Sequence, residues 1–563
     1  MSDKIADDEI TPVIAEGIDD EPIEGNRRIF SGKLGLLMAF YAGFYALFHM
    51  LALNGVSISE LTGIVIPLLP KFPMETWNFR IIHVAGALGL GFLLFSGRSF
   101  SSDGEKGSDV LNIVSIALGL AALFSLGMAL SFNAEIAAGK AWNGIDETIK
   151  FNETWLYGAP LLAATFGAIV LSWFDKRPRG SVSGLDVTLA ICGASVAAYL
   201  ITIFGTQMRN ATGTPFAPIG MSLAAVAGTA LILEMTRRVA GLALVIIAGI
   251  FLIYVFTGQY MPGVLNSPAI SWQRFFSQVY TDAGILGPTT AVSSTYIILF
   301  IIFAGFLQAS KVGDYFVNFA FAAAGRARGG PAKVAIFASG LMGMINGTSA
   351  GNVVATGSLT IPLMKRVGYS SKVAGAVEAA ASTGGQIMPP IMGAGAFIMA
   401  EVTGIPYQEI AIAAIIPAVL YYVSVYFMVD FEAAKLGMRG MKKEELPVFA
   451  ELVKQVYLFI PIIILIVALF MGYSVIRAGT LATVAAAVVS WLTPYRMGLK
   501  SIGKAFELSG LMSIQIIAVC ACAGIIVGVI SLTGVGARFA NLLLEIADTS
   551  QLLALFFAMC IAI

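Results

Sequence analysis

Apolar stretches of membrane-spanning length recur along this chain, and they limit its fold more than any other feature. A helix needs about 20 mainly apolar residues to cross the hydrocarbon layer of a bilayer. Such stretches are predicted at 34–56, 79–97, 110–132, 156–174, 185–206, 218–236, 239–258, 289–310, 373–400, 408–430, 456–474, 477–493 and 508–531, and a last one begins near 549. They predict an all-α, polytopic transmembrane protein surrounded by membrane lipid.

The composition excludes several other classes of protein. Residues are 58% hydrophobic and only 12% charged, whereas a soluble protein of 563 residues would need more charge on its surface. The net charge of zero provides no basic field for nucleic acid. The chain has no His-Glu-x-x-His sequence, nucleophile elbow or Walker motif. We therefore expect that the chain is not an enzyme and that it has no cofactor and no nucleic-acid partner.

The distribution of Lys and Arg predicts the orientation in the membrane. Arg27, Arg28 and Lys33 precede or begin the first apolar stretch and favour a cytoplasmic N-terminus. The residues before them are acidic, without the basic start of a signal peptide, so 1–30 is predicted to be an acidic cytoplasmic tail. The loop at 133–155 is mainly acidic, as expected for the opposite side.

The stretch 331–364 is long enough to enter the membrane, turn and return. Basic residues flank it on both sides: Arg326, Arg328 and Lys333 before it, and Lys365, Arg366 and Lys372 after it. Both ends are therefore expected on the cytoplasmic side. A re-entrant hairpin satisfies this condition, whereas a single crossing does not.

The middle of this stretch, 343–352, combines glycines with polar side chains. The polar residues are Asn346, Thr348, Ser349 and Asn352. Backbone at membrane depth leaves helical geometry only where protein or a watery cavity satisfies its polar groups. Side-chain oxygens suit a hard cation such as sodium, and a helix N-terminus favours a carboxylate. The alternative is a packing face of small residues, but four polar side chains in seven residues are costly for packing alone.

A second polar segment, 378–390, lies inside the apolar stretch 373–400. Two consecutive prolines, Pro389 and Pro390, remove backbone donors and break a helix. They predict a discontinuous helix with Ser382, Thr383 and Gln386 at its unwound centre, the alternative being a kinked helix without a function. Glu378 is either a functional intramembrane acid or an interfacial residue close to Lys372.

Two segments of the chain look like copies of each other. Val, Gly, Phe and Asn match between 311–318 and 534–541 at a constant offset of 223 residues (536 − 313 = 223), and Gly305 and Gly528 keep this offset. The basic loops predict opposite directions for the spans 289–310 and 508–531, so we expect inverted repeats with a solute site near their meeting point. The chain ends in the apolar run 552–563, which predicts a truncated chain that lacks its second hairpin.

Residues 289–407 resemble the large membrane subunit of TRAP transporters, the tripartite ATP-independent periplasmic family. The resemblance depends on Gly329-Gly330, on the motifs at 346–350 and 361–369, and on Ala379–Thr383 followed by Pro389-Pro390. The spans that precede this region resemble the fused form, in which the small and large subunits form one chain, and 378–407 is similar to the TAXI branch of the family.

The resemblance implies an elevator-type permease of the bacterial inner membrane. Such a permease imports a small organic acid, possibly a dicarboxylate, with a sodium or proton gradient and a periplasmic solute-binding protein. Carried over to this chain, the expected ion site is Asn346, Thr348, Ser349, Ser382 and Thr383. The expected substrate residues are Asn346, Ser349, Asn352, Gln386 and Glu378.

The expected organisation follows from these interpretations. Beyond the tail, 31–210 is expected to be small-subunit-like, 211–505 the first half of the large subunit, and 506–563 the truncated start of the second repeat. The alternative function is a channel or a non-transporting membrane scaffold subunit.

Overall fold

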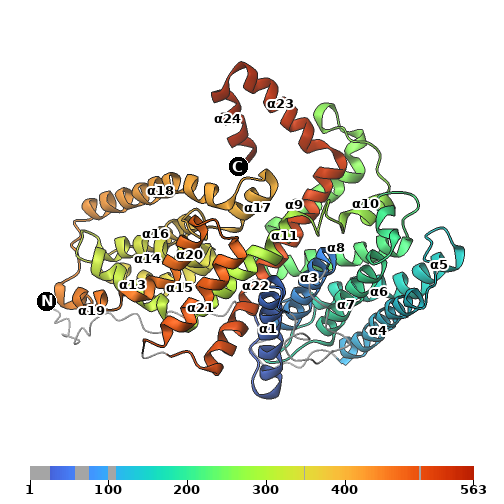
Figure 1. The fold of residues 1–563 in the computed structure, drawn as a ribbon, viewed down its shortest axis with the longest axis horizontal. Coiled ribbons are helices and arrows are strands. Elements are labelled where there is room, and N and C mark those ends of the chain that lie inside the picture. The colour runs from blue at the N-terminus through green and yellow to red at the C-terminus, as the bar shows by residue number, and fades with distance from the viewer. Residues whose placement is uncertain are drawn as a thin grey trace. The chain divides into compact units, whose positions relative to one another are not determined.

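The computed structural model describes residues 26–56, 75–98, 100, 109–347, 349–493 and 496–562. These residues form helices (Figure 1) and one isolated β-bridge between Arg27 and Phe95. Within them, ten helices are long and apolar enough to cross a membrane. The prediction of an all-α, polytopic transmembrane protein is thereby confirmed. The predicted tail lies outside the described residues up to position 25.

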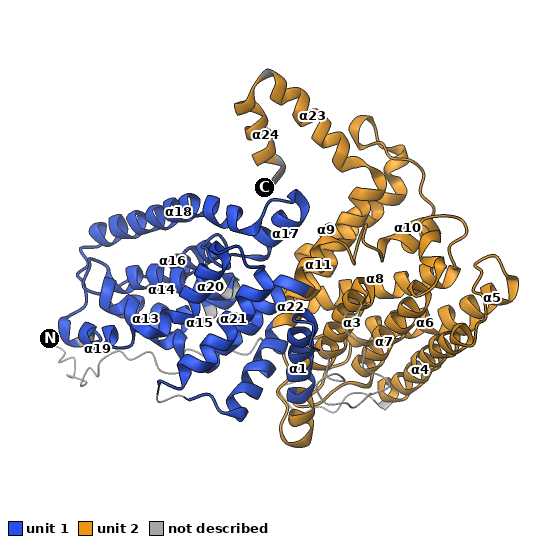
Figure 2. Cartoon of the chain, viewed as in Figure 1, with its two compact units in different colours: residues 1–24, 39–73, 295–512 blue, residues 25–38, 74–294, 513–563 orange. Residues whose placement is uncertain are grey.

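The chain forms two compact units (Figure 2). Unit 1 contains residues 39–73 and 295–512, and unit 2 contains residues 25–38, 74–294 and 513–563. The boundaries fall inside three helices: α1 (Gly32–Leu53), the π-helix η5 (Ser293–Ile297) and α22 (Leu499–Thr533).

Unit 2 is built around α7 (Gly184–Phe204), which packs against α3, α4, α6 and α8. The other helices of this unit are α3 (Thr76–Leu94), α4 (Asp109–Ala137), α5 (Glu147–Phe151), η1 (Asn152–Gly158), α6 (Ala159–Ser172), η2 (Gln207–Ala211), α8 (Ile219–Ala240), α9 (Leu242–Thr257), η3 (Gly258–Tyr260), η4 (Gly263–Leu265), α10 (Trp272–Val279), α11 (Pro288–Val292), α23 (Val535–Thr549) and α24 (Gln551–Ala562).

Unit 1 is built around α14 (Gly330–Asn346), which packs against α12, α13, α15, α16 and α18. The other helices of this unit are α12 (Ile298–Ala309), α13 (Val312–Ala324), α15 (Ser349–Arg366), α16 (Ser371–Thr383), η6 (Gly384–Gln386), α17 (Ala394–Thr403), α18 (Tyr407–Lys435), η7 (Lys443–Glu445), α19 (Phe449–Val453), η8 (Val456–Phe459), α20 (Ile460–Phe470) and α21 (Val475–Ser490).

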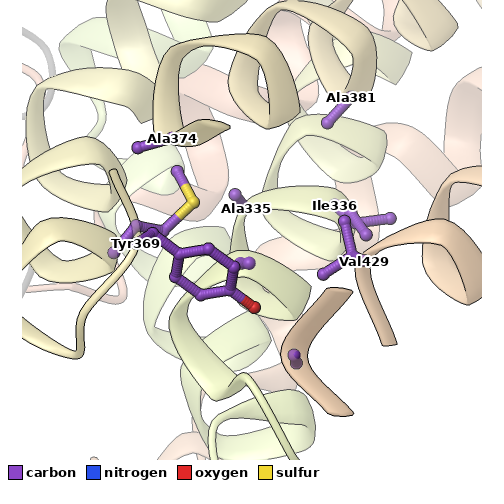
Figure 3. Packing of buried hydrophobic residues seen from close by; sticks show 9 residues of the cluster. Ala335, Ile336, Tyr369, Ala374, Ala381 and Val429 are labelled. Atoms are coloured by element: carbon purple, nitrogen blue, oxygen red, sulfur yellow. The ribbon is translucent and has the colours of Figure 1, made fainter. Parts of the chain in front are cut away.

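Small side chains allow the helices around α14 to approach closely. Ala335 and Ile336 of α14 lie in one buried cluster with Ala374 and Ala381 of α16 (Figure 3). Tyr369, between α15 and α16, closes this cluster at one end. The hairpin α14–α15 is therefore packed against α16 along its length.

A buried ionic network joins the N-terminal segment of unit 2 to α7 and α8. Asp186 accepts hydrogen bonds from Arg28 and, at 2.7 Å, from Arg238, which also donates to Glu234 at 2.7 Å. The side chains of Asp186 and Arg238 are 2% and 0% exposed. Arg238 donates further to the carbonyl of Phe95 at 2.9 Å. These contacts fix three segments that are far apart in the sequence.

The internal repeat has a counterpart in the backbone. Lys311 precedes α13 in the left-handed conformation, with φ of 61°, and Gly534 precedes α23 with φ of 68°. These two positions differ by the same 223 residues (534 − 311 = 223) that relate the two sequence segments. Left-handed geometry is uncommon for a non-glycine residue, so its recurrence at this offset supports the two helix–turn–helix segments being copies.

We expect Gly534→Ala to lower the free energy of unfolding by about 1 kcal/mol, because alanine, unlike glycine, is sterically strained in the left-handed backbone conformation. A Cβ at this position would meet nothing within 4 Å, so the cost comes from the backbone alone. Gly503→Ala is the matched control, since its Cβ is equally free and its φ is ordinary. Thermal unfolding of the purified full-length protein measures both; an equal shift in both variants would contradict the explanation.

Candidate functional site

The predicted hairpin is present as two helices that pack side by side and are joined at Gly347. α14 ends at Asn346, Gly347 is left-handed with φ of 60°, and α15 begins at Ser349. A side chain at Gly347 would meet the carbonyl oxygen of Met392. Glycine is therefore needed at this turn both for the backbone angle and for the close approach.

The predicted discontinuous helix is also present, but the prediction that Ser382 and Thr383 lie at its unwound centre is wrong, because both are still part of α16. α16 ends at Thr383, a single 3-10 turn follows at Gly384–Gln386, and α17 begins only at Ala394. Pro389 and Pro390 lie in the irregular segment between them, as their effect on helices requires. In the same segment Met392 is left-handed, with φ of 58°.

The hairpin tip and the helix break lie in direct contact. A Cβ placed on Gly385 would lie 2.7 Å from the Cα of Gly343, so the two backbones touch without intervening side chains. Nearby, Nε2 of Gln386 donates to the hydroxyl of Ser349 at 3.0 Å. The fold thus brings together the two polar segments that the sequence singled out separately.

Asn352 has a free acceptor beside this contact. Its side chain is 0% exposed, and Nδ2 donates to the carbonyl of Ser339 at 2.8 Å. Its Oδ1 has no hydrogen-bond partner among the described residues, although a buried polar group without a partner costs free energy. The position lies next to both glycines of the backbone contact, since a Cβ on Gly385 would be 3.1 Å from Nδ2. A cation or a donor group of a solute would satisfy this oxygen.

Glu378 lies in a shell of hydroxyl groups rather than at an interface. It is 0% exposed and accepts hydrogen bonds from four side chains. The donors are Thr356, Thr360 at 2.5 Å, and Ser339 and Ser382 at 3.2 Å each. Among the described residues no cation pairs with it, and Lys372 is exposed to solvent instead. Four hydroxyls therefore stabilise the carboxyl group without neutralising it.

Three residues of this shell were not singled out in the sequence. Thr356 and Thr360 follow Asn352 at intervals of four, which places all three on one face of α15. Ser339 comes from α14 and links the two parts, because its hydroxyl donates to Glu378 while its carbonyl accepts from Asn352. The four-residue spacing of Asn352, Thr356 and Thr360 could have been recognised in the sequence. The position of Ser339, in contrast, depends on how the helices pack.

The remaining predicted residues have different surroundings. The hydroxyl of Thr383 is exposed and donates to the carbonyl of Ala379 in its own helix at 2.8 Å, away from the shell around Glu378. Asn346 is the last residue of α14, but its side chain and the whole of Thr348 lie outside the described residues.

Comparison with known proteins identifies relatives of this region. A family model described as "Tripartite ATP-independent periplasmic transporter, DctM component" matches residues 227–563. The chain is similar to the "C4-dicarboxylate TRAP transporter large permease protein DctM" of Rhodobacter capsulatus, with 26% identity over 36% of this chain and 49% of the relative. Its counterpart in Pseudomonas aeruginosa is 25% identical over 39% of this chain and 52% of the relative.

A shorter match gives the same family. The protein of the same name from Vibrio cholerae is 35% identical over 16% of this chain and 20% of the relative. The chain spans about half the length of the curated relatives it matches from Rhodobacter and Pseudomonas. Because the family model covers more than half of the chain, the chain belongs to the family of the DctM component of tripartite ATP-independent periplasmic (TRAP) transporters.

Proposed function

We propose that this chain is the membrane permease of a secondary active importer for a small organic acid. The driving force is a sodium or proton gradient, and a periplasmic solute-binding protein delivers the solute. The protein works in the bacterial inner membrane with its N-terminus in the cytoplasm. The spans before residue 210 act as a fused small subunit, and the chain is of the TAXI type.

The observation that supports this proposal most is the contact between the hairpin tip and the helix break. Non-helical backbone at membrane depth is tolerated where it is buried in protein or lines a cavity, and transporters place solute and ion sites at such discontinuous helices. Here the buried Oδ1 of Asn352 has no partner in the described part of the chain, and the Ser349 hydroxyl and the Gln386 amide lie at the same contact.

In the proposed site, oxygens bind the coupling ion and amide groups orient the solute. Asn346, Thr348, Ser349, Ser382 and Thr383 are the proposed ion ligands. Asn346, Ser349, Asn352, Gln386 and Glu378 are the proposed solute residues. A hard cation prefers hydroxyl, carbonyl and carboxylate oxygens, and the amide donors of Gln386 and Asn352 suit a carboxylate.

The name of the relatives from Rhodobacter and Pseudomonas suggests the chemical class of the solute. They are described as C4-dicarboxylate permeases, so a dicarboxylate is the first solute to test. The polar groups at the hairpin contact are neutral and do not balance the negative charge of a dicarboxylate. The coupling ion would supply the positive charge, since a neighbouring cation stabilises a carboxylate.

The test is uptake of radiolabelled succinate and 2-oxoglutarate into proteoliposomes that contain the full-length transporter. Sodium and proton gradients are imposed separately, with and without the solute-binding protein. We expect accumulation against a concentration gradient that needs one of the two ion gradients and the binding protein. Passive entry that ignores both gradients would instead identify a channel, and a chain that moves no tested organic acid would contradict the proposal.

Within this test, Ser349→Ala is expected to lower ion-driven uptake by roughly tenfold, because one hydrogen-bonded oxygen lost from a binding site costs about 1–2 kcal/mol. Ser358→Ala is the matched control, since Ser358 lies on the same helix, α15, and its side chain is exposed. Membrane insertion of both variants should equal that of the wild type. Unchanged ion dependence in Ser349→Ala would remove this residue from the site.

A further inference from the structure

Three loops of unit 1 meet at the beginning of α14. The loop 325–329 contacts the loop 436–443, because the amide of Met441 donates to the carbonyl of Gly325 at 2.9 Å. The loop 367–370 reaches the same place, since a Cβ on Gly368 would lie 3.6 Å from Cε of Met438. We refer to these three segments, together with Arg366, the last residue of α15 and directly before the loop 367–370, as the basic loop cluster.

The cations of this cluster exceed their acidic partners. Asp430 is shared by the exposed Arg328 and by the buried Lys333, which donates to it at 2.6 Å. Exposed Arg326, Arg366 and Arg439 form no ion pair with any described residue. Glu432, half-buried on α18, is the further acid close to Tyr369. The cluster therefore keeps a positive charge after its internal pairs are formed.

A buried donor lies at the centre of the cluster. Tyr369 is 3% exposed, and its hydroxyl has no hydrogen-bond partner among the residues that the structure describes. This hydroxyl faces Gly329, directly before the first turn of α14, because a Cβ on Gly329 would lie 2.5 Å from it. Burial, with the nearby charges of Glu432 and Asp430, raises the pKa of this phenol to about 12, so it keeps its proton at neutral pH. The first N–H groups of a helix also favour an anion.

The surroundings favour a lipid over a soluble anion. Exposed apolar side chains lie close to the arginines in the sequence: Val367 follows Arg366 and is 37% exposed, and Leu436 is 49% exposed in the loop that contains Arg439. Phe431, near the end of α18, is 67% exposed. α18, which carries Phe431, is long and apolar enough to span a membrane. Cationic side chains next to a membrane span attract anionic headgroups, and adjacent apolar surface can contact acyl chains.

We propose that the basic loop cluster binds the phosphate headgroup of an anionic phospholipid. The guanidinium groups of Arg326, Arg366 and Arg439 supply the charge, and the Tyr369 hydroxyl donates a hydrogen bond to a phosphate oxygen. Bound lipid would hold the start of the hairpin helix α14 at the membrane surface. This site is separate from the hairpin tip, which lies at the other end of α14.

The test compares binding of phosphatidylglycerol and phosphatidylcholine to the purified full-length transporter by native mass spectrometry. The first variant carries Arg326→Gln, Arg366→Gln and Arg439→Gln. We expect its affinity for phosphatidylglycerol to fall by roughly 100-fold, because each surface cation contributes about a fivefold preference for anionic lipid. The matched control replaces three exposed cations of unit 2, with Lys140→Gln, Arg209→Gln and Arg274→Gln, and should keep its affinity.

Loss of three cations can by itself disturb membrane insertion. A second variant is therefore tested that leaves the charge unchanged. Tyr369→Phe is expected to weaken phosphatidylglycerol binding by roughly tenfold or more, the effect of one hydrogen bond to a charged group. Equal affinity of both variants and the wild type for phosphatidylglycerol would overturn the proposal. Inorganic phosphate that competes fully at the same concentration would also overturn it, since the ligand would then be a free anion.

Discussion

Replacing Asp186 by alanine is expected to lower the free energy of unfolding of unit 2 by about 3–5 kcal/mol, the usual cost of leaving a buried charge without its partner. Asp186 accepts from both Arg28 and Arg238, whose side chains are 2% and 0% exposed. Without it, two buried guanidinium groups lie close together, and among the described residues only Glu234 remains to pair with Arg238. Burial already lowers the pKa of Arg28, which shows how poorly this position accommodates an unpaired cation.

The measurement is the midpoint of thermal unfolding of purified full-length protein, together with its yield in the membrane. Glu147→Ala is the matched control, because it removes the acid of an exposed ion pair in the same unit, with Glu147 90% exposed. Exposed pairs contribute roughly 0–1 kcal/mol, so this variant should behave like the wild type. Equal stability of the two variants would show that the buried network does not hold unit 2 together.

Replacing Gly385 by alanine is expected to reduce ion-driven uptake on the order of 100-fold, the size of effect seen when reacting or binding groups are displaced by ~1 Å. The new Cβ would lie 2.7 Å from the Cα of Gly343, where backbone rather than a flexible side chain must move. The hairpin tip and the helix break would separate, and Ser349 would lose its contact with Gln386. Overpacking of this kind also costs about 1–3 kcal/mol of stability.

Gly375→Ala separates this effect from a general effect of alanine. Gly375 lies in α16, and a Cβ there would meet nothing within 4 Å. The control should keep full uptake and gain up to ~1 kcal/mol from helix propensity. Uptake by Gly385→Ala at the level of the control would mean that transport does not depend on the close contact of the two backbones.

The sequence predicted the elements that depend on local chemistry. Glycine and proline dictate where backbone can leave helical geometry, so the turn at Gly347 and the break before Pro389 were readable in advance. Apolar length predicted the ten helices among the described residues that are long enough to span a membrane, with ends that differ by several residues, as in α4, which continues to Ala137 beyond the predicted end at 132. The predicted spans at 456–474 and 477–493 are wrong in length, because the helices there are shorter than a span, and 373–400 is interrupted. The offset between the repeats was equally readable, because both copies keep the residues of the same turn.

The surroundings of Glu378 could not be decided in this way. Its proximity to Lys372 in sequence left an interfacial position open, whereas the structure buries it among hydroxyls from α14, α15 and α16. Ser339 lies 39 residues from Glu378, and no pattern along one helix links the two. That the Oδ1 of Asn352 has no partner among the described residues likewise becomes visible only from the packing of the helices.

The sequence alone thus determined the membrane class of this protein, its hairpin, its broken helix and its internal repeat. Each follows from hydrophobic length, from glycine and proline, or from residues that recur at a fixed spacing, and these properties are local to the chain. Tertiary structure alone decided that Gly343 touches Gly385 and that four hydroxyls surround Glu378. Such contacts depend on the rotation and approach of packed helices, which side-chain fit sets between segments far apart in the sequence.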